Sequence, residues 1–228
     1  MHSTKNNLQV LYQDNHLIIV NKRPGDISQG DKTGDKPLSD VVKEYLKEKY
    51  NKSGNVFLGV VHRLDRPTSG VIIFAKTSKA LERLNKMLRN KQIKKTYWAV
   101  VKNNPKTNKD CLIHYLKKNP KNNKSSVYKK EVEGSKKAIL QYEIIKTLQN
   151  YSLLEIDLET GRHHQIRAQL SHIGFPIKGD LKYGFNRSNK DGSIHLHARK
   201  IEFIHPVSNS QIAICAPTPN DVIWNACN

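Results

Sequence analysis

The sequence predicts an α+β protein with a mixed, largely antiparallel sheet flanked by helices. Two observations predict it. Strand-like and helix-like segments follow one another in the order strand, helix, several strands, helix, strands, which is typical of this class. No internal repeat or interdomain linker interrupts that order, and 228 residues suffice for one sizeable core. We therefore expect a single domain over residues 1–228.

The first half of the chain alternates short apolar runs with amphipathic segments. Residues 16–20 (HLIIV) form an apolar run that Pro24 and Gly25 close, as in a buried strand entering a turn. Residues 37–50 place apolar side chains at helical spacing, which predicts a surface helix. The runs VFLGVVH and VIIFAK follow as strands, and the polar segment RLDRPTSG between them places Asp65 on a strand-to-strand connection.

The second half contains one further pair of helices among strands. Ser78 is expected to cap a helix with a leucine stripe and a basic face. Residues 102–137 are rich in lysine and asparagine and predict a solvated basic excursion with one hairpin. The remaining expected elements are strands at TYWAVV, AILQYEIIK, YSLLEIDLE, HLHARKIEF and QIAICA, and a helix at HQIRAQLSHIG that stops at Gly174.

A formal net charge of +19 and a pI near 9.8 indicate a polyanionic partner. Such a surface attracts phosphates before any specific contact forms, so nucleic acid is the first partner to consider. No apolar run approaches the roughly 20 residues of a membrane span, and the first ten residues lack a signal-peptide core. Three cysteines in no ligand pattern favour ordinary thiols in a reducing compartment. We expect a cytoplasmic protein that does not bind membranes.

Two polar clusters could carry chemistry. Asp65 lies among His62, Arg63 and Arg66, and neighbouring positive charge would keep its carboxylate ionised as a nucleophile or base. Its plain alternative is a turn cap or an arginine partner. The second cluster is the segment ETGRHHQIRAQL, whose plain alternative is a phosphate-binding loop without chemistry. Two such clusters in one small chain suggest one site.

Histidines near the end of the chain raise the question of a metal. His195 and His197 would share one strand face, with His205 further on. No carboxylate or cysteine accompanies them at ligand spacing, so we expect no metal site. The chain also lacks the glycine-rich motifs of dinucleotide or nucleotide sites.

The order and wording of these segments resemble the RluA-type family of pseudouridine synthases, which isomerise uridines in ribosomal RNA and, in some members, in tRNA. The resemblance spans nearly the whole chain. It rests on the segments DNHLIIVNKRPGD, VVHRLDRPTSGVIIFAK, KKTYWAVV, LETGRHHQIRAQLSHIGFPIKGDLKYG and HLHARKIEFIHP. It implies the pseudouridine synthase fold, an RNA partner and no cofactor. With no room for an S4-like module before residue 10, we expect one catalytic domain acting as a monomer.

The resemblance also implies roles for individual residues. Asp65 matches the essential aspartate of the HRLD motif, and Arg63 a motif partner that shapes the loop. Tyr97 matches a tyrosine that stacks on the target base, Ile166 an apolar residue that packs against it, and Arg167 the basic partner of the aspartate. Three further motif residues are expected to shape the loop or contact RNA: Arg162, His164 and Gln165.

Some features remain open at this level. At position 163 the chain has His where the family usually has Thr or Ser, which leaves a hydroxyl role there in doubt. Lys79, Arg83 and Lys86, with lysines of residues 102–137, are expected to follow the RNA backbone. Large-subunit ribosomal RNA is the expected substrate and tRNA the second. The rival functions are a non-catalytic RNA-binding or ribosome-assembly factor and a hydrolase that uses Asp65 with His62.

Overall fold

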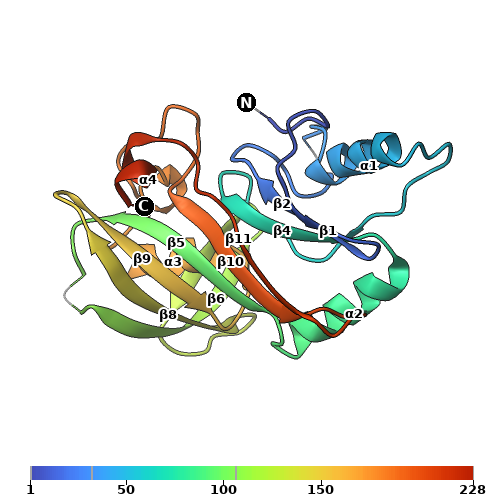
Figure 1. Ribbon diagram of the computed structural model, residues 1–228. Helices are drawn as coiled ribbons and strands as arrows, with labels where there is room; N and C mark the ends of the chain where they lie inside the picture. Colours follow the sequence, from blue (N-terminus) through green and yellow to red (C-terminus); the bar gives the residue numbers. More distant parts are fainter. Residues whose placement is uncertain (1, 32, 106, 228) are drawn as a thin grey trace. The chain divides into compact units, whose positions relative to one another are not determined.

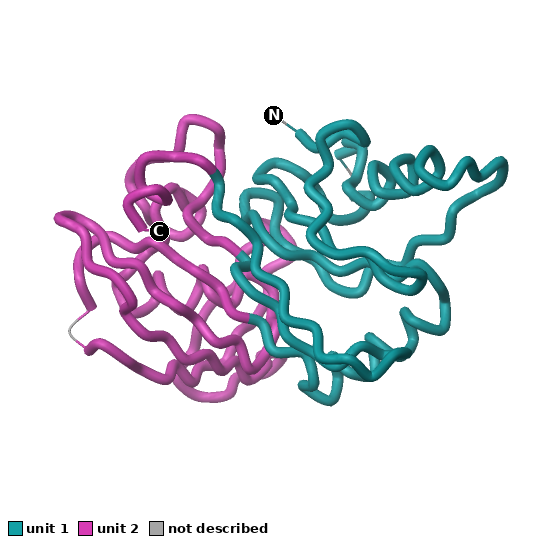
Figure 2. The backbone as a smooth tube through the Cα atoms, viewed as in Figure 1, with its two compact units in different colours: residues 1–95, 198–219 teal, residues 96–197, 220–228 magenta. Residues whose placement is uncertain are grey.

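A computed structural model describes residues 2–31, 33–105 and 107–227. Helices are few and most strands pair antiparallel, so the expected α+β class with a largely antiparallel sheet is confirmed (Figure 1). Figure 2 shows two compact units, unit 1 with residues 1–95 and 198–219 and unit 2 with residues 96–197 and 220–228. No helix within the described residues is long and apolar enough to cross a membrane.

Unit 1 is built around the strand order β1, β2, β4, β10, in which β3 pairs with β4 and β11 pairs with β10. Two strands, β5 and β10, pass from one unit into the other along the chain. The elements of unit 1 are β1 (Val10–Gln13), β2 (Leu17–Lys22), α1 (Leu38–Lys49), β3 (Gly59–Val60), β4 (Ser69–Ala75), α2 (Ser78–Arg89), the start of β5 (Lys94–Lys102), most of β10 (Leu196–Ile204), and β11 (Gln211–Cys215).

The centre of unit 1 is buried on both faces of its sheet. Along β2, Ile18 and Val20 pack in the cluster that contains the apolar stripe of α1. Leu17 and Ile19 point the other way, into the cluster that contains Leu84 of α2. A strand covered by helices on both faces carries a continuous apolar run rather than an alternating one. This is why HLIIV reads as a buried strand from the sequence.

Unit 2 contains the strand order β5, β9, β8, β6, β7, with every pair antiparallel. The expected pairing of AILQYEIIK with YSLLEIDLE is confirmed, and its connection runs through residues 148–150. The elements of unit 2, besides the rest of β5 and β10, are β6 (Lys109–Asn119), β7 (Lys124–Tyr128), β8 (Lys136–Thr147), β9 (Tyr151–Leu158), α3 (Gln165–His172), the 3-10 turn η1 (Leu181–Tyr183) and α4 (Val222–Cys227).

The two faces of the unit 2 sheet are covered differently. On one face, Ala168 of α3 packs with Leu116 and Ala138. On the other face, Trp224 of α4 packs with Val100 and Leu153 of β5 and β9. The α3 helix ends at the expected place, where Gly174 adopts a left-handed φ of 90°.

Three expectations were wrong in detail. Thr77, not Ser78, caps α2, because its side chain accepts the amide of Ala80. The run VFLGVVH yields only the two-residue strand β3. Residues 102–137 contain the expected hairpin, formed by β6 and β7, but they are not a solvated excursion, since both strands join the sheet and bury one face of their side chains.

Candidate active site

The Asp65 loop connects β3 to β4 in unit 1, as expected, and its backbone is held by the segment that follows β2. The Oγ of Ser28 donates to the carbonyl of Leu64 at 3.0 Å and accepts its amide at 3.1 Å. The amide of Gly25 donates to the carbonyl of Arg66 at 2.8 Å. Within the loop, the amide of Thr68 donates to the carbonyl of Asp65. The half-buried Asp65 therefore sits on a braced turn.

A buried lysine completes that brace. Lys22 is fully buried at the end of β2, and its Nζ donates to the carbonyls of Arg23, Arg66 and Thr68 at 3.1, 3.1 and 2.6 Å. Burial lowers the pKa of Lys22 to about 7, against the opposing charges of Asp26 and Asp65. Lys22 thus holds the carbonyls of Arg66 and Thr68, which follow Asp65 in the loop. Its amine titrates near neutral pH.

The far end of the loop needs a glycine. Gly70 has a φ of 115°, and a Cβ placed there would lie 2.3 Å from the carbonyl oxygen of Ala198. Before the loop, the amide of Ile73 donates to Nε2 of His62 at 3.2 Å, and desolvation lowers the pKa of His62 to about 3. His62 is a neutral hydrogen-bond acceptor for the backbone, and this favours a structural role over the general base that the hydrolase alternative requires.

The basic residues expected to bind RNA in unit 1 differ in their exposure. Arg63, Lys79 and Lys86 are exposed, while the half-buried Arg83 donates to the carbonyl of Pro206 at 2.8 Å. Lys79, Arg83 and Lys86 share one face of α2 because they lie three or four residues apart. Arg83 therefore anchors α2 to the turn after β10 as well as contributing charge.

In unit 2, the buried Gln165 shapes the loop before α3. Its Oε1 accepts the amide of Arg162 at 3.0 Å and the hydroxyl of Thr160 at 2.8 Å, while its Nε2 donates to the carbonyl of Ile139 at 3.0 Å. The Nε of Arg162 donates to the carbonyl of Lys137 at 3.0 Å. The glycine–arginine turn is thereby tied to β8.

Histidines continue this loop. His164 precedes α3 as its N-cap residue in the left-handed region, with a φ of 53°, and its Nδ1 lies 3.0 Å from the hydroxyl of Tyr183. The ring of His163 stacks on that of His164 with centroids 3.8 Å apart, and its Nδ1 lies 3.0 Å from the hydroxyl of Ser125. The imidazole of His163 therefore connects the loop before α3 to β7, the strand that contains Ser125.

Arg167 makes a buried ion pair with Asp180, which the sequence did not indicate. Nε and Nη2 donate to the two carboxylate oxygens at 2.7 and 2.9 Å, and the side chains are only 6% and 1% exposed. The guanidinium also lies over the ring of Tyr183, with its central carbon 5.1 Å from the centroid. Such a fork fixes the plane of the guanidinium. Asp180 uses two of its five N–H donors.

Tyr97 lies on the face of the unit 2 sheet that is covered by α3, the helix that contains Ile166. Tyr97 is 7% exposed on β5 and pairs with Ile156, whose other partner is Tyr142 on β8. The buried side chains of that face continue to β6, where Gln169 of α3 donates to the carbonyl of Leu112. Unit 2 thus places Tyr97 on the face that α3 covers.

The late histidines are packed rather than arranged as ligands. The ring of His195 stacks on Trp224 with centroids 5.2 Å apart, and its Nε2 lies 3.1 Å from a carboxylate oxygen of Asp221. His197 meets the same tryptophan edge-on. Burial lowers the pKa of His195 to about 4. Among the described residues, no group of three or more potential ligands is placed to hold a metal.

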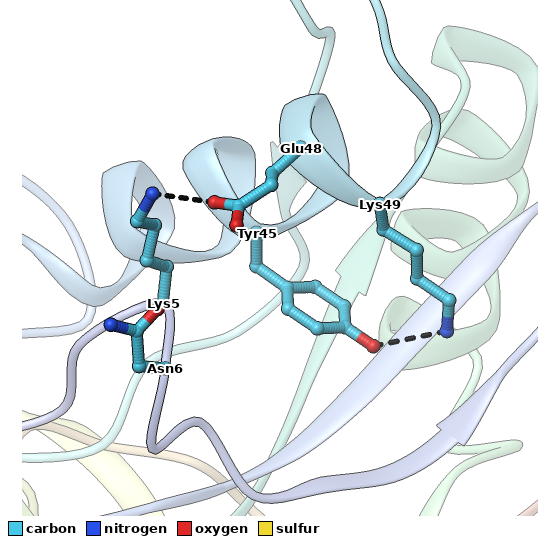
Figure 3. A pocket seen from close by; sticks show the side chains of 5 residues that line it. All are labelled: Lys5, Asn6, Tyr45, Glu48 and Lys49. Atoms are coloured by element: carbon cyan, nitrogen blue, oxygen red, sulfur yellow. Dashed lines mark hydrogen bonds and ion pairs between the residues drawn. The ribbon is translucent and has the colours of Figure 1, made fainter.

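Unit 1 also has a pocket, and none of the expected site residues lines it. It is lined by Lys5, Asn6, Tyr45, Glu48 and Lys49 (Figure 3). Lys5 pairs with Glu48 at 2.5 Å, and Lys49 donates to the hydroxyl of Tyr45 at 3.0 Å. Each charged side chain of the pocket thus has a partner, so we assign the pocket no chemistry.

Solved structures share this architecture. A human protein described as RNA Pseudouridylate Synthase Domain Containing 4 matches with a TM-score of 0.80 and 22% identity, covering 96% of this chain and 92% of its own. The fold is therefore that of pseudouridylate synthases. A family model described as RNA pseudouridylate synthase matches residues 16–172. The chain belongs to this family of RNA uridine isomerases.

Curated relatives indicate the type of pseudouridine synthase within this family. Ribosomal large subunit pseudouridine synthase C of Buchnera aphidicola subsp. Acyrthosiphon pisum is 36% identical over 227 residues, covering 96% of this chain and 70% of the relative. A Synechocystis sp. protein, named as an uncharacterized RNA pseudouridine synthase, is 32% identical over 216 residues, covering 93% of this chain and 66% of the relative. The resemblance to the RluA type is confirmed, and the chain spans about two thirds of these relatives.

Proposed function

We propose that this protein converts specific uridines of large-subunit ribosomal RNA to pseudouridine, with Asp65 as the catalytic carboxylate. One observation supports the substrate above others: the Buchnera relative named for the ribosomal large subunit is 36% identical over 227 residues. The net charge of +19 suits a polyanionic substrate. With this substrate, we expect the protein to act as a monomer in the cytoplasm.

The proposed reaction rearranges one nucleoside without redox change. The bond from the ribose to the uracil nitrogen breaks, the uracil turns while bound, and a bond forms from the ribose to carbon 5. The proton of carbon 5 leaves and the released nitrogen gains one, so the product is an isomer. The target base must first leave the stack, which costs a few kcal/mol and calls for an apolar or aromatic pocket.

Asp65 is the proposed reactive group. It attacks the anomeric carbon, attacks the base, or removes a ribose proton. Support comes from the bracing of its loop by Lys22 and Ser28, since a reacting carboxylate must be held close to its productive geometry. We assign Arg167 as the cationic partner of this carboxylate.

The substrate base is proposed to rest on Tyr97 and Ile166. Support comes from their place in unit 2, since Tyr97 lies on the face of the sheet that α3 covers and Ile166 is a residue of α3. Arg162, His164 and Gln165 are proposed to shape the loop that contacts the RNA, and Arg63 the loop around Asp65. Support comes from the three hydrogen bonds of Gln165 and from the contact of His164 with Tyr183.

Lys79, Arg83 and Lys86 are proposed to follow the RNA backbone. Each phosphate contact to single-stranded RNA contributes about 0.7 to the slope of log affinity against log salt. Replacing the two exposed members, Lys79 and Lys86, with glutamine should lower the slope by about 1.4. Lys47→Gln with Lys52→Gln, two exposed lysines at the end of α1, is the matched control. An unchanged slope in the variant of Lys79 and Lys86 would refute the proposal that α2 follows the RNA backbone.

Pseudouridine mapping of total RNA decides the substrate. In cells that lack the protein, we expect one or more pseudouridines to disappear from large-subunit ribosomal RNA and to return with the wild-type gene. Loss from tRNA alone would make tRNA the substrate. Unchanged mapping in both RNAs would favour the assembly factor.

A further inference from the structure

Part of the unit 2 sheet exposes an unusual set of side chains on the face opposite α3. Successive side chains of a strand point to opposite faces. In β6, Leu112, His114 and Leu116 are buried on the α3 face. Ile113, Tyr115 and Lys117 therefore point to the opposite face, where Ile113 is 52% exposed.

The neighbouring strands extend this exposed face. Tyr115 lies directly opposite Tyr128 of β7 on one side and Lys137 of β8 on the other. Ile113 lies opposite Ile139 of β8. Cα partners in an antiparallel pair bring their side chains within contact distance. Tyr115, Tyr128 and Lys137 thus form one row across three strands, with Lys117 beside it. We call these four residues the outer tyrosine patch.

The charge around this patch is strongly positive. Residues 117–137 contain eight lysines and two glutamates, a net charge of +6. On the same face, the acidic side chains lie farther along the sheet. Glu143 pairs with Lys109 at 2.9 Å, and Glu155 of β9 accepts the indole N–H of Trp98 at 3.0 Å. Basic and aromatic groups are therefore collected at the β6–β7 end, where an anionic strand would lie without meeting the acidic row.

We infer that the outer tyrosine patch binds an unpaired segment of the substrate RNA. Sheets that bind single-stranded RNA stack bases on aromatic side chains of adjacent strands, while cations hold the phosphates. Tyr115 and Tyr128 supply two such rings, and Lys117 and Lys137 supply the cations. An acidic protein segment would match the lysines but would leave the paired tyrosines without a role.

This surface is separate from the proposed base pocket. Tyr97 belongs to the α3 face of the sheet, and the outer tyrosine patch belongs to the other. β7 is the last strand in the order of the unit 2 sheet. RNA that reaches both faces passes around β7, and Lys124 of that strand lies 5.1 Å from the ring of Tyr183 near α3. The inference rests on the proposed function for its substrate and adds a second contact that helps select it.

Binding of a fluorescein-labelled 12-nucleotide oligouridine to the full chain tests the patch. Tyr115→Ala with Tyr128→Ala should weaken binding about thirtyfold or more, because two stacked bases would lose their aromatic partners. Tyr115→Phe with Tyr128→Phe keeps both rings and should bind within about twofold of wild type. Lys117→Gln with Lys137→Gln should lower the salt slope by about 1.4. Lys47→Gln with Lys52→Gln in unit 1 makes the same charge change and should leave the slope unaltered.

The lysine variant keeps the test decisive if the alanine variant folds poorly. Wild-type affinity in the alanine variant, or a wild-type slope in the lysine variant, would overturn the inference and leave the face to a protein partner. Turnover on ribosomal RNA from cells lacking the protein is measured in parallel. If the wild-type protein modifies this RNA and the variants match it in KM, the patch fails and the proposed function stands. If the wild type modifies nothing, the proposed function fails and oligouridine binding alone decides the patch.

Discussion

Arg167 and Asp180 form a bidentate ion pair in unit 2, with both side chains almost completely buried. They lie thirteen positions apart along the chain. The proposed role of Arg167 requires a guanidinium held in one direction, and a buried carboxylate fork does this. Breaking a buried pair by removing one partner is costly because it leaves a buried charge without compensation.

Asp180→Asn is therefore expected to destabilise unit 2 by about 3–5 kcal/mol. Urea unfolding followed by tryptophan fluorescence measures this, because Trp98 and Trp224 both lie in unit 2. Glu133→Gln, an exposed change in the same unit, is the control and should stay within about 0.5 kcal/mol. The double variant Arg167→Met/Asp180→Leu should regain much of the stability without regaining turnover. Full turnover in that variant would contradict the role of Arg167.

Lys22 predicts a stability that rises with pH. Its pKa is about 7 in the folded chain and has the ordinary value of 10.5 in the unfolded chain. Between these values the unfolded chain binds a proton that the folded chain lacks, so the free energy of unfolding rises with pH. Below about pH 7 both states are protonated, and the contribution is constant. The slope approaches about 1.4 kcal/mol per pH unit.

Lys22→Met should remove this component of the slope between about pH 7 and about pH 9. Because unit 1 contains no tryptophan, circular dichroism is the suitable probe of unfolding. Lys47→Met, at an exposed site, should keep the wild-type slope. We also expect Lys22→Met to lower turnover, because the carbonyls of Arg66 and Thr68 lose their donor. Equal slopes in the wild type and Lys22→Met would refute the assignment of a neutral buried amine.

Gly70→Ala should cost about 3 kcal/mol or more. The new Cβ would meet the backbone of Ala198, and the positive φ adds strain of its own. Thermal unfolding of the variant measures the loss. Gly30→Ala is the matched control, because nothing lies within 4 Å of its Cβ position. Similar midpoints for both variants would show that the end of the Asp65 loop tolerates a side chain.

Much of the fold could be predicted because burial on both faces leaves a simple mark in the sequence. The apolar run of β2 and the helical spacing of α1 are examples. β6 was harder to predict, since only Leu112, His114 and Leu116 alternate within a lysine-rich stretch. Its strand structure depends on pairing with β8, and a local sequence pattern cannot indicate that pairing.

The candidate site, too, could be predicted only in part. Sequence motifs mark Asp65 and the loop before α3, but not the groups that hold them. A lysine next to a turn is usually exposed to solvent. Lys22 is instead fully buried, and its amine donates to backbone carbonyls. The motif KGDLKYG carries the only sequence signal for Asp180 and Tyr183, and nothing in it indicates an arginine partner.

The central claim is that Asp65 performs the chemistry. Its most direct test is pseudouridine formation by purified Asp65→Asn on ribosomal RNA from cells that lack the protein, with RNA binding measured on the same preparation. We predict no detectable pseudouridine and nearly wild-type affinity, because lysines and arginines rather than this carboxylate bind the phosphates. Turnover at the wild-type rate in Asp65→Asn would contradict the account.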